Sequence, residues 1–309
     1  RVTATNGANS TTTALFYGFV PDDAAPSTSV PASCSLPNAS SNAYAGSENL
    51  FRDMAPGNSR TNFLTVMLTA SNLAQAKLVV DRGVASDSTF PTQTVFLAKS
   101  DDTARNIRYT LFDNAIFDTR LRGDYSMQRT NTYSSRFLGS LLGYENGYAN
   151  AAPTTNFVPG ALADQLTSYG GQLYEQTDHT TALQFLNAGA AGSYGTIVEP
   201  CAYLVKFPAP QNYFCQARGF TMAESYYQSV TNPYQGLLLG EPLSAPFARP
   251  AGGSWNGLPA NALLSGTTNL SLQVTAADPA RPVQQVDLFV DGTFAQTLTN
   301  IPPRTNNVL

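Results

Sequence analysis

The chain has 309 residues, 42% of them hydrophobic, which is enough for two domains of ordinary size and a substantial buried core. Only 12% of the residues are charged, the net charge is −4 and the basic residues are scattered, which argues against a nucleic-acid-binding protein. No apolar run approaches the roughly 18 residues that span a membrane, so we expect no membrane span. Uncharged polar residues replace the charges, which favours a secreted or cell-surface bacterial protein.

Residues 1–60 are rich in Ser, Thr, Ala, Asn and Pro, and we predict irregular surface structure there. The chain begins at Arg1 without a methionine and ends abruptly at Leu309. We therefore expect a fragment of a longer precursor, in which case the absence of a targeting segment carries no information.

The next part of the chain, up to residue 119, predicts strands that alternate with helices. Residues 62–69 (NFLTVMLT) predict a buried strand, and Ser71 is expected to cap the helix that follows. Residues 92–99 predict a second strand, and the polar residues after it are expected to start a helix over residues 104–117.

The same alternation continues to residue 247. Predicted strands cover residues 137–142, 163–169, 193–198 and 237–239, and predicted helices cover 180–188 and 220–230. Asp178 or Thr180 is expected to cap the first of these helices, and Gly189 to end it. Strands alternating with helices indicate a mostly parallel sheet covered on both faces, so we predict a three-layer α/β domain over residues 61–247.

Ligands of such sheets bind beyond the carboxyl ends of the strands. The residues at the predicted ends are therefore the candidate binding residues. Tyr144 falls in a predicted loop over residues 143–148, and its alternative role is packing in an aromatic turn. The full set is Tyr144, Tyr169, Gly170, Gly171, Glu199 and Glu241. We expect a protein or carbohydrate ligand there.

Two arrangements at these ends would carry chemistry. Ser168 with His179, the one histidine of the chain, would form a hydrolase site if Asp178 or Glu199 orients the imidazole. Otherwise His179 is a capping or surface residue. Glu199 and Glu241 each precede a proline, and together they would do acid–base work or bind calcium if their strands are neighbours. The alternative, which we favour, is that each accepts hydrogen bonds from the following turn.

The three cysteines are Cys34, Cys201 and Cys215. Cys201 and Cys215 flank a loop rich in proline and aromatic residues, and we predict a disulfide between them. The alternative is a nucleophilic or metal-binding thiol at Cys201. Glu199 would raise the pKa of that thiol instead of lowering it. With one histidine in the chain we expect no metal site, and we expect no cofactor.

The composition changes after residue 247. Residues 248–262 predict a linker, and residues 263–309 alternate apolar and polar side chains with a hairpin signal at Asp291-Gly292. This part resembles the start of a bacterial immunoglobulin-like domain. It is too short for a complete sandwich of about 100 residues, so we predict a truncated immunoglobulin-like β segment.

The central part resembles an uncharacterised family of bacterial secreted proteins. The motifs that carry the resemblance are TSYGG at 167–171, GAAGSYGTIVEPC at 189–201, KFP at 206–208, AESYY at 223–227 and LGEPLSAPF at 239–247.

More remotely, the layout is similar to gingipain-type cysteine peptidases, which implies a caspase-like fold. That resemblance also implies a nucleophilic cysteine where Ser168 stands and a histidine within residues 143–148, where there is none. We therefore expect a monomeric, non-catalytic, peptidase-like domain that binds a ligand at its strand ends. The alternative is a hydrolase, most simply a peptidase, using Ser168 or Cys201 with His179.

Overall fold

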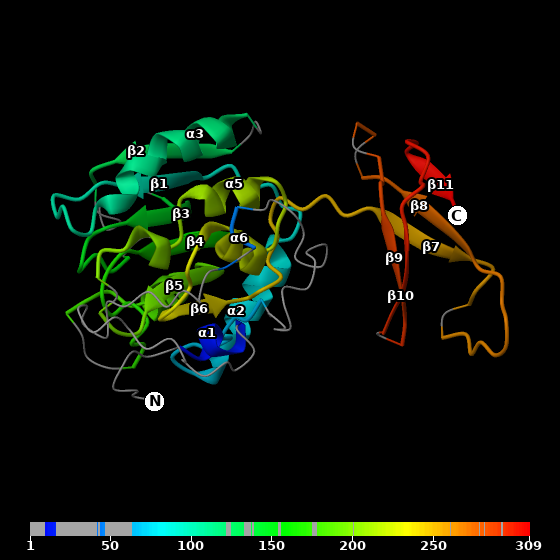
Figure 1. Cartoon of the computed structure of the whole chain (residues 1–309), viewed down its shortest axis with the longest axis horizontal. Coiled ribbons are helices and arrows are strands. Elements are labelled where there is room, and N and C mark those ends of the chain that lie inside the picture. The colour runs from blue at the N-terminus through cyan, green and yellow to red at the C-terminus, as the bar shows by residue number, and fades with distance from the viewer. Residues whose placement is uncertain are drawn as a thin grey trace. The chain divides into compact units, whose positions relative to one another are not determined.

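The chain forms two compact units, residues 1–248 and 249–309. In the computed structural model, described residues are 10–16, 42, 44–46, 64–121, 125–132, 137, 139–153, 156–174, 178–199, 201–259, 261–277, 279–280, 282–291 and 293–309. Figure 1 labels the helices and strands of each unit.

The first unit is built on a six-stranded sheet with the order β2-β1-β3-β4-β5-β6. All neighbouring strands are parallel except β5 and β6, which are antiparallel. The mostly parallel α/β architecture predicted from the sequence is therefore confirmed. The strands are β1 (Thr94–Ala98), β2 (Ser126–Thr130), β3 (Leu141–Asn146), β4 (Phe157–Gln165), β5 (Gly192–Thr196) and β6 (Gly236–Gly240).

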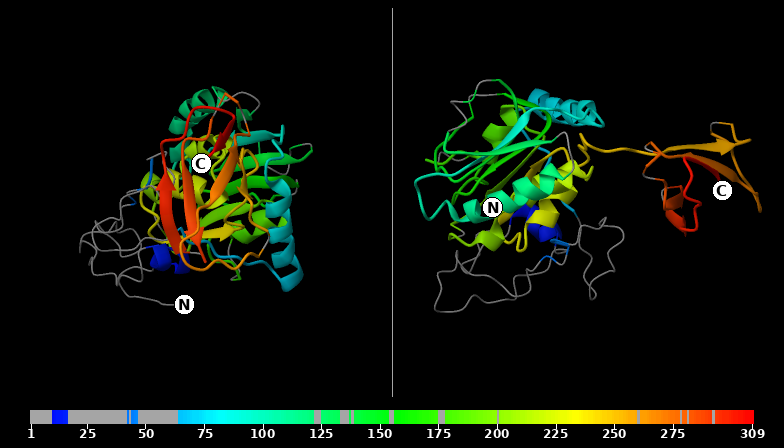
Figure 2. Two further views of the ribbon diagram at one scale, coloured as in Figure 1. Left: turned by 90° about the vertical axis from the view of Figure 1, so that its right-hand side faces the viewer. Right: turned by 90° about the horizontal axis from the view of Figure 1, so that it is seen from above.

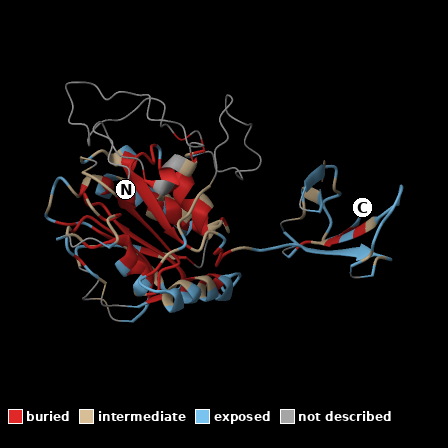
Figure 3. Ribbon diagram, turned by 90° about the horizontal axis from the view of Figure 1, so that it is seen from below, coloured by how far each residue is buried: buried red, intermediate tan, exposed pale blue. Residues whose placement is uncertain are grey.

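Helices cover both faces of this sheet, and the view from above in Figure 2 shows α2 and α3 on opposite sides. The α-helices are α1 (Thr11–Phe16), α2 (Leu73–Ser86), α3 (Phe112–Arg120), α4 (Ala182–Asn187), α5 (Gln211–Ala217) and α6 (Met222–Ser229). Two 3₁₀ turns, η4 (Ile107–Leu111) and η6 (Leu204–Lys206), follow strands β1 and β5. The outer face of α2 is exposed, whereas strands β3 to β6 are mostly buried, as Figure 3 shows.

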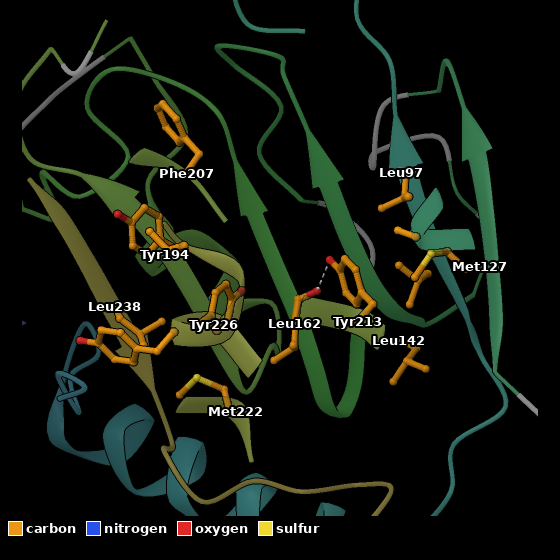
Figure 4. Packing of buried hydrophobic residues seen from close by; sticks show 14 of the residues in the cluster. Leu97, Met127, Leu142, Leu162, Tyr194, Phe207, Tyr213, Met222, Tyr226 and Leu238 are labelled. Atoms are coloured by element: carbon orange, nitrogen blue, oxygen red, sulfur yellow. Dashed lines mark hydrogen bonds between the residues drawn. The ribbon is translucent and has the colours of Figure 1, made fainter. Parts of the chain in front are cut away.

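The core between the sheet and helices α3, α5 and α6 is rich in aromatic residues and methionine. Met222 and Tyr226 of α6 pack over the strands together with Tyr213 of α5, and the Tyr213 hydroxyl donates to the Leu162 carbonyl of β4 at 3.1 Å (Figure 4). On the opposite face, Val79 of α2 packs with residues of α4 and β6. Burial of both sheet faces explains why these strands read as apolar runs.

Local sequence signals explain where the helices begin and end. The N-cap of α2 is Asn72, whose side chain accepts from the Gln75 amide at 3.0 Å, and not Ser71 as predicted. Thr181 caps α4 in a capping box with Gln184, so neither Asp178 nor Thr180 is the cap. Gly189 ends that helix with a φ of 110°, which confirms the prediction.

Several predicted elements differ from the structure. Residues 64–69 of the predicted first strand make one parallel bridge, Met67 to Leu239, instead of a strand, and residues 62–63 lie outside the described part. The predicted helix over 104–117 is divided into η4 and α3. The edge strand β2 and helix α5 were not predicted, because a polar edge strand and a short helix have weak hydrophobic periodicity.

The predicted irregular region at the start of the chain includes a helix that packs on the core. Phe16 of α1 stacks on Tyr227 of α6 with ring centroids 4.6 Å apart. The Thr13 hydroxyl donates to the Pro233 carbonyl at 2.8 Å, next to the start of β6. Most of residues 1–60, including Cys34, lies outside the described residues.

The second unit contains two small antiparallel sheets, one of β9 and β10 and one with the order β11-β8-β7. The hairpin predicted at residues 291–292 is confirmed, since Val290 lies opposite Thr293. The predicted linker is wrong in part, because β7 lies within residues 248–262 and pairs with β8. The strands are β7 (Gly252–Asn256), β8 (Ser271–Thr275), β9 (Val286–Val290), β10 (Thr293–Leu298) and β11 (Asn306–Val308).

Candidate binding site at the strand ends

The carboxyl ends of β4 and β5 place Ser168 beside Glu199. The Ser168 hydroxyl donates to Glu199 Oε2, while Glu199 Oε1 accepts the Cys201 amide at 2.8 Å. Both carboxylate oxygens therefore hold the loops that leave these strands. Thr196 of β5 fixes the same turn, because its hydroxyl lies 2.9 Å from both the Thr167 and the Ser168 carbonyl oxygens.

His179 lies at the same edge but pairs with Thr167. Its Nδ1 is 2.8 Å from the Thr167 hydroxyl oxygen, and the imidazole stacks on the Tyr169 ring with centroids 5.4 Å apart. Among the described residues, Ser168 and His179 share no hydrogen bond. The predicted residues are thus gathered in one region, but not in the order nucleophile, base and orienting acid that a hydrolase triad needs.

The environment of His179 keeps its ring neutral at neutral pH. Partial burial, with a further contribution from the positive charge of Arg105, lowers the pKa of His179 below 6.5, and Glu199 and Asp178 act in the opposite direction. Tyr169 and His179 are both half-buried, so the stacked pair leaves an aromatic surface in contact with solvent. A neutral aromatic pair beside a carboxylate suits the binding of sugars or peptide side chains.

The predicted disulfide between Cys201 and Cys215 is wrong. Cys201 is disulfide-bonded, whereas Cys215 is a buried thiol on α5 that donates to Gln228 Oε1 of α6 at 3.1 Å. Helix α5 turns Cys215 into the core, whereas Cys201 lies in a half-buried loop. The disulfide also removes Cys201 from the candidate nucleophiles.

Gly170 and Gly171, predicted as ligand contacts, are buried packing positions. The Gly171 amide donates to the Thr196 carbonyl at 2.8 Å, and the Gly170 carbonyl accepts the Ala182 amide of α4 at 2.7 Å. A Cβ atom at Gly195 of β5 would lie 2.3 Å from the Gly170 carbonyl carbon. These glycines therefore allow two backbone segments to touch.

Tyr144 was expected in a loop but lies within β3 and is fully buried. It is paired with Phe96 of β1, and its ring contacts Phe137 edge-on at 5.6 Å. The strand runs further than predicted because Glu145 and Asn146 are still paired with β1. Of the two interpretations of Tyr144, the structure therefore supports packing.

Glu199 and Glu241 do not converge. Because β6 is antiparallel to β5, Glu241 at the end of β6 lies at the opposite edge of the sheet from Glu199. There it packs on α2, where its side chain occupies the space that a Cβ atom of Gly83 would need. A shared carboxylate site is thus ruled out by strand direction, which the sequence pattern did not reveal.

A buried charge cluster lies at the carboxyl ends of β3 and β4, on the same side of the sheet as Ser168 and Glu199. The sequence did not predict it. Arg108 of η4 donates to Asp164 Oδ1 at 2.5 Å, and its Nε is 3.2 Å from Glu145 Oε1. The guanidinium also donates to the Pro208 and Asn146 carbonyls at 3.0 and 2.8 Å. The signal that could have found this cluster is a carboxylate in each of two apolar strands, LLGYEN and GALADQ.

Two carboxylates and one guanidinium leave an excess negative charge in the core, and a proton on Glu145 removes it. Both Glu145 oxygens are buried and accept no hydrogen bond within the described structure. Burial, together with the charge of Asp164, raises the pKa of Glu145 to about 8 in spite of Arg108. Glu145 is therefore mostly protonated at neutral pH.

This proton predicts a pH-dependent stability. The pKa of Glu145 rises from an ordinary 4.5 to about 8 in the folded protein, so between these values only the folded state holds the proton. The free energy of unfolding should fall as the pH rises through this interval, by at most about 1.4 kcal/mol per pH unit, and should level off above it. Urea denaturation at a series of pH values measures the slope. In Glu145→Gln, which keeps the shape without the titration, this contribution should be absent, so the wild-type curve should fall more steeply than the variant curve over this interval. Parallel curves for both proteins would contradict this assignment.

The described residues contain no group of three or more His, Cys, Asp or Glu side chains placed to hold a metal ion. None of the described helices has the length and apolar character that crossing a membrane requires. Comparisons of the chain with protein-family models, curated proteins and solved structures found no match.

Proposed function

We propose that residues 1–248 form a non-catalytic, peptidase-like domain of a secreted or cell-surface bacterial protein. It binds a protein or carbohydrate ligand at the carboxyl ends of β4 and β5. The mostly parallel sheet with helices on both faces is the arrangement that a caspase-like fold requires. The second unit, with its antiparallel sheets, would be part of an immunoglobulin-like display module.

The observation that carries this proposal is how the candidate catalytic groups are engaged. The Ser168 hydroxyl donates to Glu199, His179 Nδ1 is hydrogen-bonded to Thr167, and Cys201 is held in a disulfide. The other oxygen of Glu199 accepts the Cys201 amide at 2.8 Å, so this carboxylate is used to hold the loop after β5. The half-buried Tyr169 remains as a contact surface.

The disulfide at Cys201 also supports the proposed location. Structural disulfides persist in oxidising compartments and are rare in the cytosol. Together with the low content of charged residues, this favours a protein that works outside the cytosol.

Binding can be tested with an oligosaccharide array and a displayed random-peptide library. We expect ligands from at least one of them, with an affinity that Tyr169→Ala lowers about tenfold or more, as for an aromatic contact in an interface. The matched control is Phe117→Ala, which removes an exposed aromatic side chain from α3 and should leave the affinity unchanged. Equal losses in both variants, or no ligand in either collection, would count against the proposal.

The second candidate function is a serine hydrolase, favoured by the contact between Ser168 and a carboxylate. It is distinguished by incubating the protein with a fluorophosphonate probe, which reacts with activated serines. We expect no labelling. Labelling of the wild-type chain that disappears in Ser168→Ala would replace the binding proposal with a hydrolase.

A further inference from the structure

Lys206 and Gln235 bring a buried amine and a buried amide into contact. Lys206 is the last residue of η6, and Gln235 directly precedes β6. Both residues are completely buried, and Lys206 Nζ lies 2.8 Å from Gln235 Oε1. The amide carbon of Gln235 is one covalent bond from that oxygen, so the amine is already beside the carbon that it would attack.

Three features of Gln235 set it apart from an ordinary buried glutamine. Its Nε2 is buried and has no hydrogen-bond partner within the described structure. Its backbone has a φ of 68°, a region that side-chain-bearing residues seldom occupy. The turn is nevertheless fixed, because the Gly236 amide donates to the Pro233 carbonyl at 2.8 Å and the Ile197 amide donates to the Gln235 carbonyl at 3.0 Å.

Two tyrosine rings lie near the amine. Lys206 Nζ lies 5.8 Å from the centre of the Tyr203 ring and 5.3 Å from that of Tyr234, and the Tyr194 hydroxyl donates to the Lys206 carbonyl at 2.8 Å. Burial lowers the pKa of Lys206 to about 8, and the negative charge of Glu199 acts against that shift. A substantial fraction of the lysine is therefore the neutral, nucleophilic amine at slightly alkaline pH.

We propose that Lys206 and Gln235 join in an intramolecular isopeptide bond. The lone pair of Nζ attacks Cδ of Gln235, a bond between Nζ and Cδ forms, and the bond between Cδ and Nε2 breaks. The amide nitrogen leaves as ammonia and takes up the proton that Nζ releases, so no oxidant or further reactant is needed.

The isopeptide bond would remove two buried polar groups whose burial costs free energy. A buried amine that would otherwise carry charge and an amide nitrogen without a partner are replaced by one neutral secondary amide. Holding the two groups in contact supplies the proximity that such a slow reaction needs. The bond would tie the loop after β5 to the start of β6.

The test is the intact mass of the purified full chain after reduction of its disulfide. We expect a mass below that of the sequence by one ammonia molecule, and tandem mass spectrometry of a digest should show the peptides of Lys206 and Gln235 as one branched species. The deficit should form faster at pH 9 than at pH 6. Lys206→Arg, which keeps the charge but cannot react, and Gln235→Met should both show the full sequence mass.

The wild-type protein alone decides the question if the variants fail to fold. A folded wild-type chain that retains its full sequence mass after prolonged incubation at pH 9 would overturn the proposal. A deficit that maps to any other pair of residues would overturn it equally.

Discussion

Replacing Arg108 with methionine should lower the free energy of unfolding by about 3–5 kcal/mol, as expected when one partner of a buried ion pair is removed. Asp164 would lose the donor now 2.5 Å away, and its buried carboxyl group would be left without a cation, which costs free energy whether it stays charged or takes up a proton. The Pro208 carbonyl would lose its Arg108 donor as well, whereas the Asn146 carbonyl would still accept the Leu166 amide at 2.9 Å. Chemical denaturation of both proteins at neutral pH measures the difference.

Two further variants separate charge from packing. Asp164→Asn added to Arg108→Met should recover part of the loss, because it removes the carboxyl group that lost its cation but leaves the Pro208 carbonyl without its Arg108 donor. Arg129→Met is the matched control, since the Arg129 and Asp113 side chains are 58% and 70% exposed and such pairs contribute less than about 1 kcal/mol. Similar losses for Arg108→Met and Arg129→Met would show that the buried cluster has no special role.

Gly195→Ala should have an effect of similar size for a steric reason. The added Cβ atom would lie 2.3 Å from the Gly170 carbonyl carbon and 2.5 Å from the Gly171 nitrogen. These are backbone atoms, which cannot move aside as the end of a flexible side chain can. We expect a loss of at least about 3 kcal/mol, or failure to fold. Soluble yield and chemical denaturation measure it.

Gly170→Ala is the neighbouring control. A Cβ atom there would meet Gly195 Cα at 3.4 Å, close to an ordinary contact, so we expect a much smaller loss. The comparison also bears on the proposed function, because the turn after β4 carries both Ser168 and Tyr169. If Gly195→Ala is as stable as the wild-type chain, the close packing of β5 on this turn is not required.

The Arg108 cluster and the hydrogen bonds of Glu199 support the proposed binding surface in different ways. Arg108 joins η4 to β3, β4 and the segment before α5, and it makes the support of the surface rigid. Glu199 orders the loop after β5 through its bonds to Ser168 and Cys201. A rigid support of this kind suits recognition of a ligand, because little ordering is needed on binding.

The fold class was predicted from local hydrophobic patterns, and the structure has strands and helices where several of these patterns occur. Apolar runs such as Leu237 to Leu239 are buried strands, and the helix predicted over 220–230 corresponds to α6, capped by Thr221 with Glu224. Such signals lie within a few residues of one another and depend on the period of the hydrophobic side chains. Strands and helices of this kind can therefore be predicted without knowledge of the contacts that the rest of the chain makes.

Site residues were predicted only in part. Ser168, Tyr169, His179 and Glu199 do meet at one edge, because they follow two strands that are parallel neighbours. Tyr144 and Glu241 do not belong to that edge, because the extent of β3 and the direction of β6 depend on pairing with other strands.

The sequence by itself determined the alternation of strands and helices, the turn at Gly189 and the change in composition near residue 248, because each follows from neighbouring residues. Only the tertiary structure decided that β6 runs against β5, that Cys215 stays a thiol, and that Arg108 meets Glu145 and Asp164. The reason is physical: these outcomes depend on contacts between residues far apart in the chain, and a local pattern does not encode which distant partner a buried group will find.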